Sequence, residues 1–169
     1  MIRLIKLNKY KDSRGYLCPV WREDKDQWDS LPTFCEDRLS VSEKGVLRGL
    51  HGDFTTGKLF IPVRGCFQFF AQQLNGNNRL ITKIDSKDPH AIYVPPGWIN
   101  GHLCLGEGEN ILLYKWTKYY NGPENQVTIA WDDKTLNVPW GIKNPILSDR
   151  DKNACSYDEI IDKFTNKGL

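Results

Sequence analysis

The sequence predicts an all-β protein, an antiparallel sandwich or barrel with short peripheral helices. Short apolar or alternating runs recur along the chain, and the links between them are rich in Gly, Asn, Asp and Pro, which is the pattern of many strands joined by tight turns. Seven such runs follow one another between residues 58 and 130, a spacing typical of sandwiches and barrels. The length of 169 residues suits one domain over residues 1–169.

The first expected element is a strand at the N-terminus, where residues 1–9 alternate apolar with basic or polar side chains. This segment lacks the apolar stretch and small-residue cleavage site of a secretory signal. The central strands are expected at 58–64, 66–74, 79–84, 91–94, 101–105, 110–117 and 126–130. Turn residues separate them, as in the Asn-Gly-Asn-Asn link at 75–78 and the Pro-Pro-Gly link at 95–97.

Two segments are expected to be helical, residues 23–31 and residues 157–164. In the second segment Ser156 can cap the N-terminus, and Ile160, Ile161 and Phe164 form an apolar stripe at helical spacing. We therefore expect a short C-terminal helix that packs against the β structure.

The composition excludes some classes of function. The chain has 23 basic and 21 acidic residues and a net charge of +2, so no strong overall field attracts nucleic acid or an anionic membrane. No stretch approaches the roughly 18 consecutive apolar residues of a membrane span. The five cysteines are widely spaced and form no CxxC pair, which indicates reduced thiols in a cytoplasmic protein. We expect the partner to be recognised at a local site.

With only three histidines, each can be considered singly, and His51 has the most informative surroundings. In a regular strand, alternation places Arg48 and His51 on opposite faces. A bulge or bend at Gly49 would bring them together and set an imidazole beside a guanidinium suited to a phosphate. On spacing alone, a histidine hydrogen-bonded for structural reasons is the better interpretation.

A metal site finds little support in the spacing of potential ligands. Metal-binding barrels usually need an HxH pair with a carboxylate and a further histidine. His51, Asp53 and His102 could supply three ligands, but no spacing requires it. The sequence therefore predicts no metal.

Eight motifs in order carry a resemblance to a known family. The sequence resembles the cupin-fold epimerases of nucleotide-linked 4-keto-6-deoxy sugars, typified by the dTDP-4-dehydrorhamnose 3,5-epimerases. The motifs are Asp12-Ser-Arg-Gly15, Gly45-Val-Leu-Arg-Gly-Leu-His51, Gly57-Lys-Leu59, Val63-Arg-Gly65, Tyr93-Val-Pro-Pro-Gly97, Leu113-Tyr-Lys115 with Tyr119-Tyr120, Ala130-Trp-Asp-Asp133 and Ile146-Leu-Ser-Asp-Arg-Asp151. The resemblance implies a cupin, or jelly-roll, barrel and an isomerase that needs no cofactor and forms a homodimer.

The resemblance also implies a role for four residues. In a 4-keto sugar the hydrogens on C3 and C5 are acidic, because the resulting carbanion delocalises onto the ketone oxygen as an enolate. His51 matches the base that removes such a proton, and Asp151 matches the carboxylate that orients its ring. Tyr114 matches the acid on the opposite face, and Lys58 matches the lysine that stabilises the enolate.

A second group of residues matches substrate-binding positions. Arg48 and Arg14 match arginines that contact the nucleotide sugar, and the set is completed by Glu36, Arg38 and His102. The expected ligand is a dTDP- or GDP-linked sugar. The aromatic rings of Trp98 and Trp116 are candidate stacking surfaces for its sugar or base.

Taken singly, each proposed catalytic residue has an ordinary structural explanation. Tyr114 stands in an apolar strand and fits a core tyrosine. Asp151 stands in a charge-rich segment that fits a solvated turn or helix start, where Asp149 is an alternative carboxylate, as is Asp53. A lone lysine such as Lys58 is usually on the surface.

The sequence departs from the family pattern at several positions. Arg38 replaces a neutral amide, Gly52-Asp53 replaces the usual Tyr-Gln, and a short hairpin at 75–78 replaces a longer segment. The first two changes are more similar to the branch that acts on GDP-linked 4-keto heptoses in capsule pathways. Two alternatives stay open, a 3,4-ketoisomerase of the same architecture and a non-catalytic protein that binds sugar nucleotides.

Overall fold

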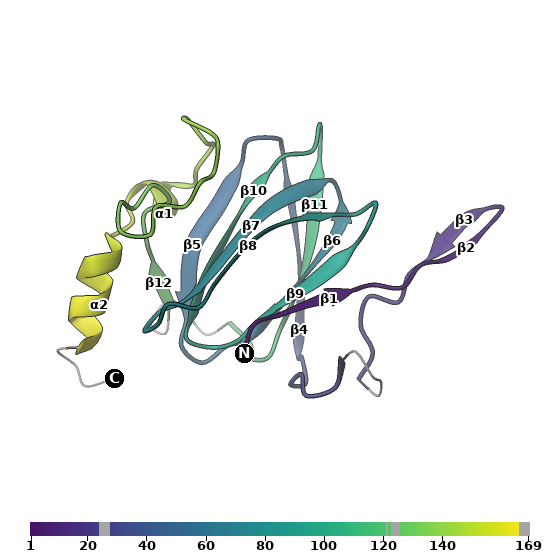
Figure 1. Ribbon diagram of the computed structural model, residues 1–169, viewed down its shortest axis with the longest axis horizontal. Coiled ribbons are helices and arrows are strands. Elements are labelled where there is room, and N and C mark those ends of the chain that lie inside the picture. Colours follow the sequence, from purple (N-terminus) through teal and green to yellow (C-terminus); the bar gives the residue numbers. More distant parts are fainter. Residues whose placement is uncertain (24–27, 121, 123–125, 166–169) are drawn as a thin grey trace.

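Two five-stranded antiparallel sheets face each other in the computed structural model, which describes residues 1–23, 28–120, 122 and 126–165 (Figure 1). The first sheet has the order β1-β9-β6-β11-β4 and the second the order β12-β5-β10-β7-β8. Their bounds are β1 Arg3–Lys6, β4 Glu36–Ser42, β5 Leu47–Asp53, β6 Lys58–Arg64, β7 Cys66–Gln73, β8 Arg79–Asp85, β9 His90–Val94, β10 Trp98–Cys104, β11 Asn110–Trp116 and β12 Gln126–Thr128. The predicted all-β jelly roll is confirmed.

The space between the sheets is filled by the inward-facing residues of each strand. Alternation along β7 turns Phe67, Phe69 and Ala71 inward, where they pack against Phe60 and Leu112 of the first sheet. Because successive side chains point to opposite faces, Phe70 of the same strand joins a different cluster on the outer face of the second sheet. Burial on both faces explains why this strand reads as a nearly continuous apolar run.

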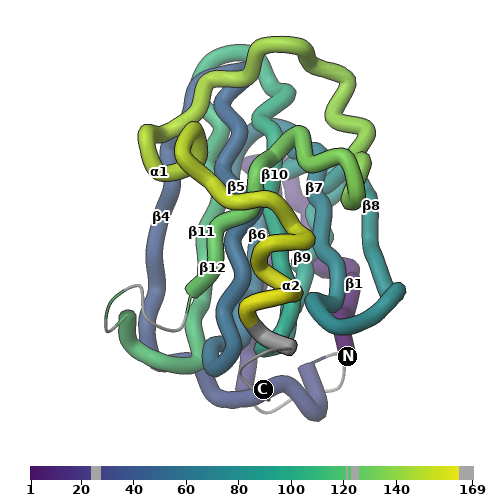
Figure 2. The backbone as a smooth tube through the Cα atoms, turned by 90° about the vertical axis from the view of Figure 1, so that its left-hand side faces the viewer, coloured from purple at the N-terminus to yellow at the C-terminus, as the bar shows by residue number. Residues whose placement is uncertain are grey.

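The C-terminal part of the chain covers the outer face of the second sheet. Helix α2, Tyr157–Thr165, confirms the predicted C-terminal helix and buries Ile160. Figure 2 looks onto this face, with the yellow C-terminal segment in front of the strands. A second short helix, α1, spans Asp149–Lys152 and begins at the cap residue Ser148. This places α1 beside β5, the strand that carries His51.

The segment before β4 differs from its predicted structure. The predicted helix over 23–31 is wrong at most of its described positions: Glu23 is in a bend, Trp28 has 3₁₀-helical geometry, and Asp29 and Ser30 form a turn in which the carbonyl of Trp28 accepts the N–H of Leu31 at 3.1 Å. Residues 24–27 lie outside the described part. Aromatic packing decides the conformation, because Trp21 contacts Trp28 and Phe34 edge to face, with ring centroids 5.3 and 4.8 Å apart.

A two-stranded arm extends from the N-terminal part of the chain. Strands β2, Tyr10–Asp12, and β3, Gly15–Leu17, pair only with each other, and Figure 1 shows them projecting away from the barrel. All six residues of the two strands are exposed. The prediction of one domain over residues 1–169 stays a prediction, because the description stops at residue 165.

Strand β5 carries the irregularity that the sequence suggested at Gly49. Against β10, His51 pairs with Asn100 but Arg48 pairs with His102, so two residues of β5 stand opposite one of β10. This is a β-bulge. It turns Arg48 and His51 toward the same side of the sheet, and the two side chains line the same cavity.

Candidate active site

Four cross-strand pairs, two from each sheet, line a cavity of about 60 Å³ in the barrel interior. The first sheet contributes two pairs of β6 and β11, Lys58 with Trp116 and Phe60 with Tyr114. The second sheet contributes two pairs of β5 and β10, His51 with Asn100 and Arg48 with His102. The cavity thus brings together five of the nine predicted site residues: His51, Tyr114, Lys58, Arg48 and His102.

Asp151 stands behind His51 rather than in the cavity wall. Its Oδ1 lies 2.6 Å from Nε2 of His51, although the two residues are 100 positions apart. If Nε2 carries the proton, the ring donates to the carboxylate and leaves the Nδ1 lone pair as the basic atom. This is the arrangement of a carboxylate that orients a histidine base.

Helix α1 holds the Asp151 carboxylate in place. Its backbone N–H donates to Oγ of the cap residue Ser148 at 3.2 Å, and the residue is 3% exposed. Burial raises the pKa of Asp151, but hydrogen bonds from His51, Ser148 and the backbone of Gly49 outweigh it, so that pKa lies below its ordinary value. The carboxylate is therefore charged at neutral pH, and the helix-start interpretation of this segment is also correct.

Tyr114 presents its hydroxyl from the opposite sheet. The hydroxyl donates to Oγ of Ser40 at 2.7 Å, and the ring packs edge to face on Phe60 at 5.0 Å. Burial raises the pKa of Tyr114, and Ser40 and Arg48 offset part of that rise. The phenol is thus protonated at neutral pH and can act as a proton donor.

Lys58 is not a surface lysine. It is 5% exposed, and its Nζ lies over the Trp116 ring, 4.6 Å from the centroid. Burial lowers the pKa of Lys58 to about 8, and the nearby Asp53 carboxylate raises it in part. The ammonium form is still the major one at pH 7, in a site with little competing water.

His102 and Arg48 complete the cavity on the second sheet. His102 is 3% exposed, and burial, with the charge of Arg48, lowers its pKa to about 3, so the ring is neutral at physiological pH. Its Nε2 is buried without a hydrogen-bond partner among the described residues. Arg48 donates from Nε to Oγ of Ser42 at 3.0 Å, which leaves the rest of its guanidinium for a ligand.

Arg38 and Glu36 flank the cavity without lining it. The Arg38 guanidinium stacks 4.2 Å from the Trp116 ring centroid and 5.1 Å from that of Tyr120. Its Nε pairs with the Glu36 carboxylate at 2.5 Å, and Arg38 lowers the pKa of Glu36. Of the two predicted stacking residues, Trp116 lines the cavity, whereas Trp98 is buried in the core between the sheets.

Arg14 lies outside the site of its own chain. It is in the turn of the projecting arm, where its side chain is 88% exposed and pairs with Asp12 at 2.6 Å. The alternative carboxylates are also accounted for elsewhere. Asp149 is exposed and pairs with Lys152 at 3.2 Å.

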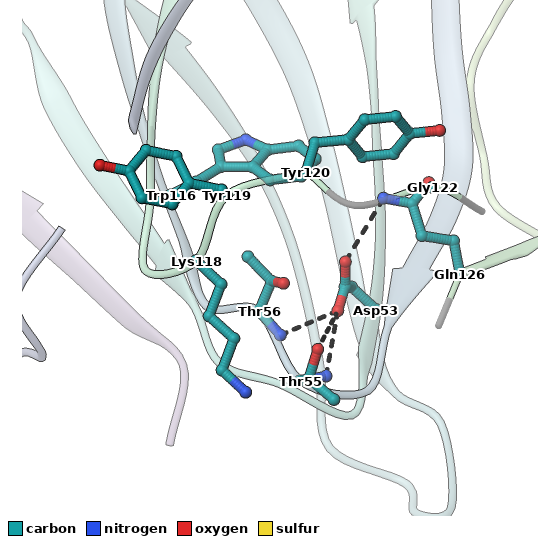
Figure 3. A pocket seen from close by; sticks show the side chains of 9 residues that line it. All are labelled: Asp53, Thr55, Thr56, Trp116, Lys118, Tyr119, Tyr120, Gly122 and Gln126. Atoms are coloured by element: carbon teal, nitrogen blue, oxygen red, sulfur yellow. Dashed lines mark hydrogen bonds between the residues drawn. The ribbon is translucent and has the colours of Figure 1, made fainter. Parts of the chain in front are cut away.

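A second pocket of about 190 Å³ adjoins the cavity and shares Trp116 with it. Figure 3 shows its floor, where Asp53 accepts the backbone N–H groups of Thr55 and Thr56 at 3.0 and 2.8 Å. Asp53 therefore stabilises the turn between β5 and β6 and does not orient His51. The other lining residues are Lys118, Tyr119, Tyr120, Gly122 and Gln126.

Several functional positions escaped the sequence analysis. On β4, the hydroxyl of Ser40 accepts a hydrogen bond from Tyr114, and that of Ser42 accepts one from Arg48. These serines alternate along the strand with Glu36 and Arg38, so the sequence could have indicated that all four share one face. Asn100 donates to the carbonyl of His51 at 3.0 Å. No motif in the sequence singled out this residue.

Two further properties concern the described part of the chain. Within it, no group of three or more His, Cys, Asp or Glu side chains is arranged to hold a metal ion. Its helices are all too short or too polar to cross a membrane.

Comparison with known proteins decides the family. Residues 2–159 match the family described as dTDP-4-dehydrorhamnose 3,5-epimerase. The chain belongs to this family. The dTDP-4-dehydrorhamnose 3,5-epimerase of Methanothermobacter thermautotrophicus is 31% identical over 161 residues, which cover 89% of this chain and 86% of that protein. The chain spans only 48% of a longer Neisseria gonorrhoeae relative, at 30% identity over 162 residues and 89% of this chain.

Solved epimerase structures share the fold over nearly the whole chain. The Mycobacterium tuberculosis rmlC epimerase superposes with a TM-score of 0.86 at 27% identity, covering 96% of this chain and 86% of that one. The Legionella pneumophila epimerase, solved in complex with dTDP-4-keto-L-rhamnose, has a TM-score of 0.84 at 26% identity, with 94% and 89% covered. The predicted family, and with it the isomerase class, is confirmed.

Proposed function

We propose that this epimerase-family protein inverts C3, C5 or both centres of a nucleotide-linked 4-keto-6-deoxy sugar, in bacterial surface-polysaccharide biosynthesis. One observation carries the proposal. His51, held by Asp151 at 2.6 Å, and Tyr114 belong to facing sheets and line one cavity, and Lys58 lines the same cavity. A base, an acid and a fixed cation around one small cavity suit proton removal and return beside a ketone.

The first step transfers a proton from carbon to His51. Nδ1 takes the proton on C3 or C5, and the electron pair of the broken C–H bond moves into the ring to form the enolate with its negative charge on the C4 oxygen. Asp151 stabilises the imidazolium that results. Lys58, charged below its pKa of about 8, stabilises the enolate oxygen.

The second step returns a proton on the other face. The Tyr114 hydroxyl protonates the carbon as the enolate collapses to the ketone, leaving a phenolate. Exchange with solvent removes the proton from His51 and restores the one on Tyr114, so each turnover introduces a solvent hydrogen. Burial, which raises the pKa of Tyr114, keeps the acid protonated between turnovers.

Solvent exchange tests the proposed function. The protein is incubated with dTDP-4-keto-6-deoxyglucose in D₂O, and deuterium at C3 and C5 is followed by NMR. We expect incorporation at one or both carbons with the wild-type protein and none with His51→Asn. Absence of deuterium at both carbons with the wild type, with the dTDP-linked and the GDP-linked 4-keto sugar alike, would overturn the proposal.

A GDP-linked 4-keto sugar is a second candidate substrate. By the resemblance described above, Arg38 takes the place of a neutral amide, and its guanidinium contacts the rings of Trp116 and Tyr120 beside the cavity. A guanidinium suits the acceptor edge of guanine, as it does in nucleic-acid recognition. Parallel exchange assays with dTDP- and GDP-linked sugars separate the two candidates, since the preferred nucleotide gives the higher kcat/KM.

We further infer a homodimer. Leu39 and Val41 on the edge strand β4 are 65% and 50% exposed, and Tyr16 and Leu17 on the projecting arm are 53% and 71% exposed. An uncovered apolar strand face and an exposed arm are each suited to contact with a second copy of the chain. In such a dimer the arm would carry Arg14 to the partner, and sedimentation analysis tests the state.

A cytoplasmic location is part of the same proposal. All five cysteines lie in the described residues and are free. Free thiols persist in the reducing cytoplasm, whereas exported proteins usually pair them. Fractionation of cells that express the protein tests this location.

A further inference from the structure

Trp116 has a polar atom that the mechanism does not use. The residue is 7% exposed, and its indole N–H is buried with no hydrogen-bond partner among the described residues. An indole nitrogen can only donate. Leaving a buried donor unsatisfied is costly, and most buried polar groups in proteins have a partner.

The position of the ring explains where a partner would lie. Trp116 lines both the reaction cavity and the adjoining pocket. Figure 3 shows it among the residues of the adjoining pocket. It is the cross-strand neighbour of Lys58, whose ammonium lies over the ring. Arg38 also stacks on the ring. The two cations fix the indole by contacts to its π system, which leave the N–H uncommitted.

Packing alone does not account for this side chain. A phenylalanine would offer an aromatic ring to Lys58 and Arg38 without burying an unsatisfied donor. The other buried polar atom without a partner among the described residues is Nε2 of His102, a residue that lines the same cavity. Two lining residues that each carry an unpaired polar atom indicate a ligand with several polar groups.

We propose that the indole N–H of Trp116 donates a hydrogen bond to an oxygen of the bound sugar, and that Trp116 is a binding and specificity residue for the sugar rather than for the nucleotide. The inference rests on the proposed function, because it takes the sugar to be the occupant of the cavity. Sugar oxygens are acceptors, which the donor-only indole requires. A 4-keto sugar bears them at several carbons.

Binding measurements with Trp116→Phe test this role. Calorimetry compares dTDP-glucose, which is not a substrate for enolate chemistry, with dTDP alone. Loss of one neutral hydrogen bond weakens binding about three- to tenfold. We expect that loss for dTDP-glucose, and unchanged affinity for dTDP.

Trp140→Phe is the matched control. The Trp140 indole N–H donates to the carbonyl of Trp131 at 2.9 Å, and Trp140 lies outside the cavity lining, in the cluster that includes Ile160 of α2. This variant removes an indole donor of purely structural use. It should lower the melting temperature and leave both affinities unchanged.

A measurement on the wild-type protein makes the test independent of folding of the variant. The indole N–H signal of Trp116 should move downfield in ¹H–¹⁵N NMR on addition of dTDP-glucose and stay in place with dTDP. The proposal is overturned if the signal does not move with dTDP-glucose, if Trp116→Phe binds dTDP-glucose like wild type, or if it loses affinity for dTDP equally. Wild-type binding of dTDP-glucose no tighter than dTDP would also overturn it. Failure of the proposed reaction is recognised separately, by absent deuterium exchange.

Discussion

Asp151 reaches His51 from a different element, with Oδ1 2.6 Å from Nε2, and the pair is buried on the carboxylate side, where Asp151 is 3% exposed. The helix that carries Asp151 starts immediately after the cap residue Ser148, and its first turn packs on β5. The orientation of the imidazole therefore depends on a four-residue helix near the C-terminal end of the chain.

Asp151→Asn should abolish most of the activity while preserving the fold. The amide has nearly the shape of the carboxylate, but it neither stabilises an imidazolium nor enforces the Nε2–H tautomer. We expect the rate of deuterium exchange at C3 and C5 to fall at least about a hundredfold. Asp149→Asn, an exposed change in the same helix, is the control and should keep normal exchange. Exchange at the wild-type rate in Asp151→Asn would show that the pair is only structural.

Tyr114→Phe should separate proton removal from proton return. The phenylalanine ring keeps the packing on Phe60 but has no proton to give, whereas His51 and Lys58 can still form the enolate. We expect deuterium exchange with retention at the carbon and at least a hundredfold less inverted product. Ser40→Ala removes only the acceptor of the Tyr114 hydroxyl and should reduce inversion far less. Normal inversion by Tyr114→Phe would exclude Tyr114 as the acid.

Lys58→Met should stabilise the protein and inactivate it. The pKa of Lys58 in the folded protein is about 8, against an ordinary value of 10.5. Below pH 8 the folded protein therefore holds a buried charge that lowers its free energy of unfolding by about 3 kcal/mol. Between pH 8 and 10.5 the unfolded chain holds a proton that the folded chain has lost, and wild-type stability rises. Urea unfolding should therefore show a gain for Lys58→Met at pH 7 that shrinks toward pH 10.5.

The activity of Lys58→Met should fall, although its stability should rise. The enolate needs the ammonium, so wild-type kcat should fall as the pH rises through about 8, and Lys58→Met should lose at least about a hundredfold at pH 7. Lys44→Met removes an exposed pair with Glu107 and should change neither stability nor rate appreciably. A wild-type rate that stays constant from pH 7 to 10 would contradict the role of Lys58.

The regular elements were predictable because they depend on local patterns. A short apolar run followed by the Arg64-Gly65 turn predicted residues 58–64, which is β6 in the structure, and the apolar stripe predicted α2. The prediction of a helix over 23–31 was wrong because Trp28 is buried by contacts with Trp21 and its neighbours. Such tertiary packing overrides helical spacing. Local patterns hold no information on those contacts.

The candidate site was predictable in its residues but not in its contacts. The resemblance implied His51 and Asp151 as a pair, yet their contact spans 100 positions and depends on where α1 lies. The stacking of Arg38 on Trp116 depends in the same way on the register of β4 against β11. Arg14 was predicted to contact the nucleotide sugar, whereas in the structure its exposed side chain lies in the turn of the arm and pairs with Asp12.

Gly49 makes the relationship between Arg48 and His51 possible, and its replacement gives the last prediction. The residue has φ of +136°, which favours glycine, and an added Cβ would lie 2.6 Å from Cα of Gly101 and 3.0 Å from the carbonyl oxygen of Asn100. These are backbone atoms of β10, so the strands must separate for Gly49→Ala to fit.

Gly49→Ala should therefore lower both stability and activity. We expect the free energy of unfolding to fall by at least about 2 kcal/mol. The rate of exchange at C3 and C5 should fall at least about tenfold, because a small displacement of His51 misaligns the base. Gly97→Ala is the matched control, because Gly97 has φ of +78° but an added Cβ meets nothing within 4 Å. This substitution should lower the free energy of unfolding by about 1 kcal/mol and leave the rate of exchange unchanged. Equal effects of the two substitutions on exchange would mean that the bulge does not position His51, since of the two glycines only Gly49 lies in the bulge of β5.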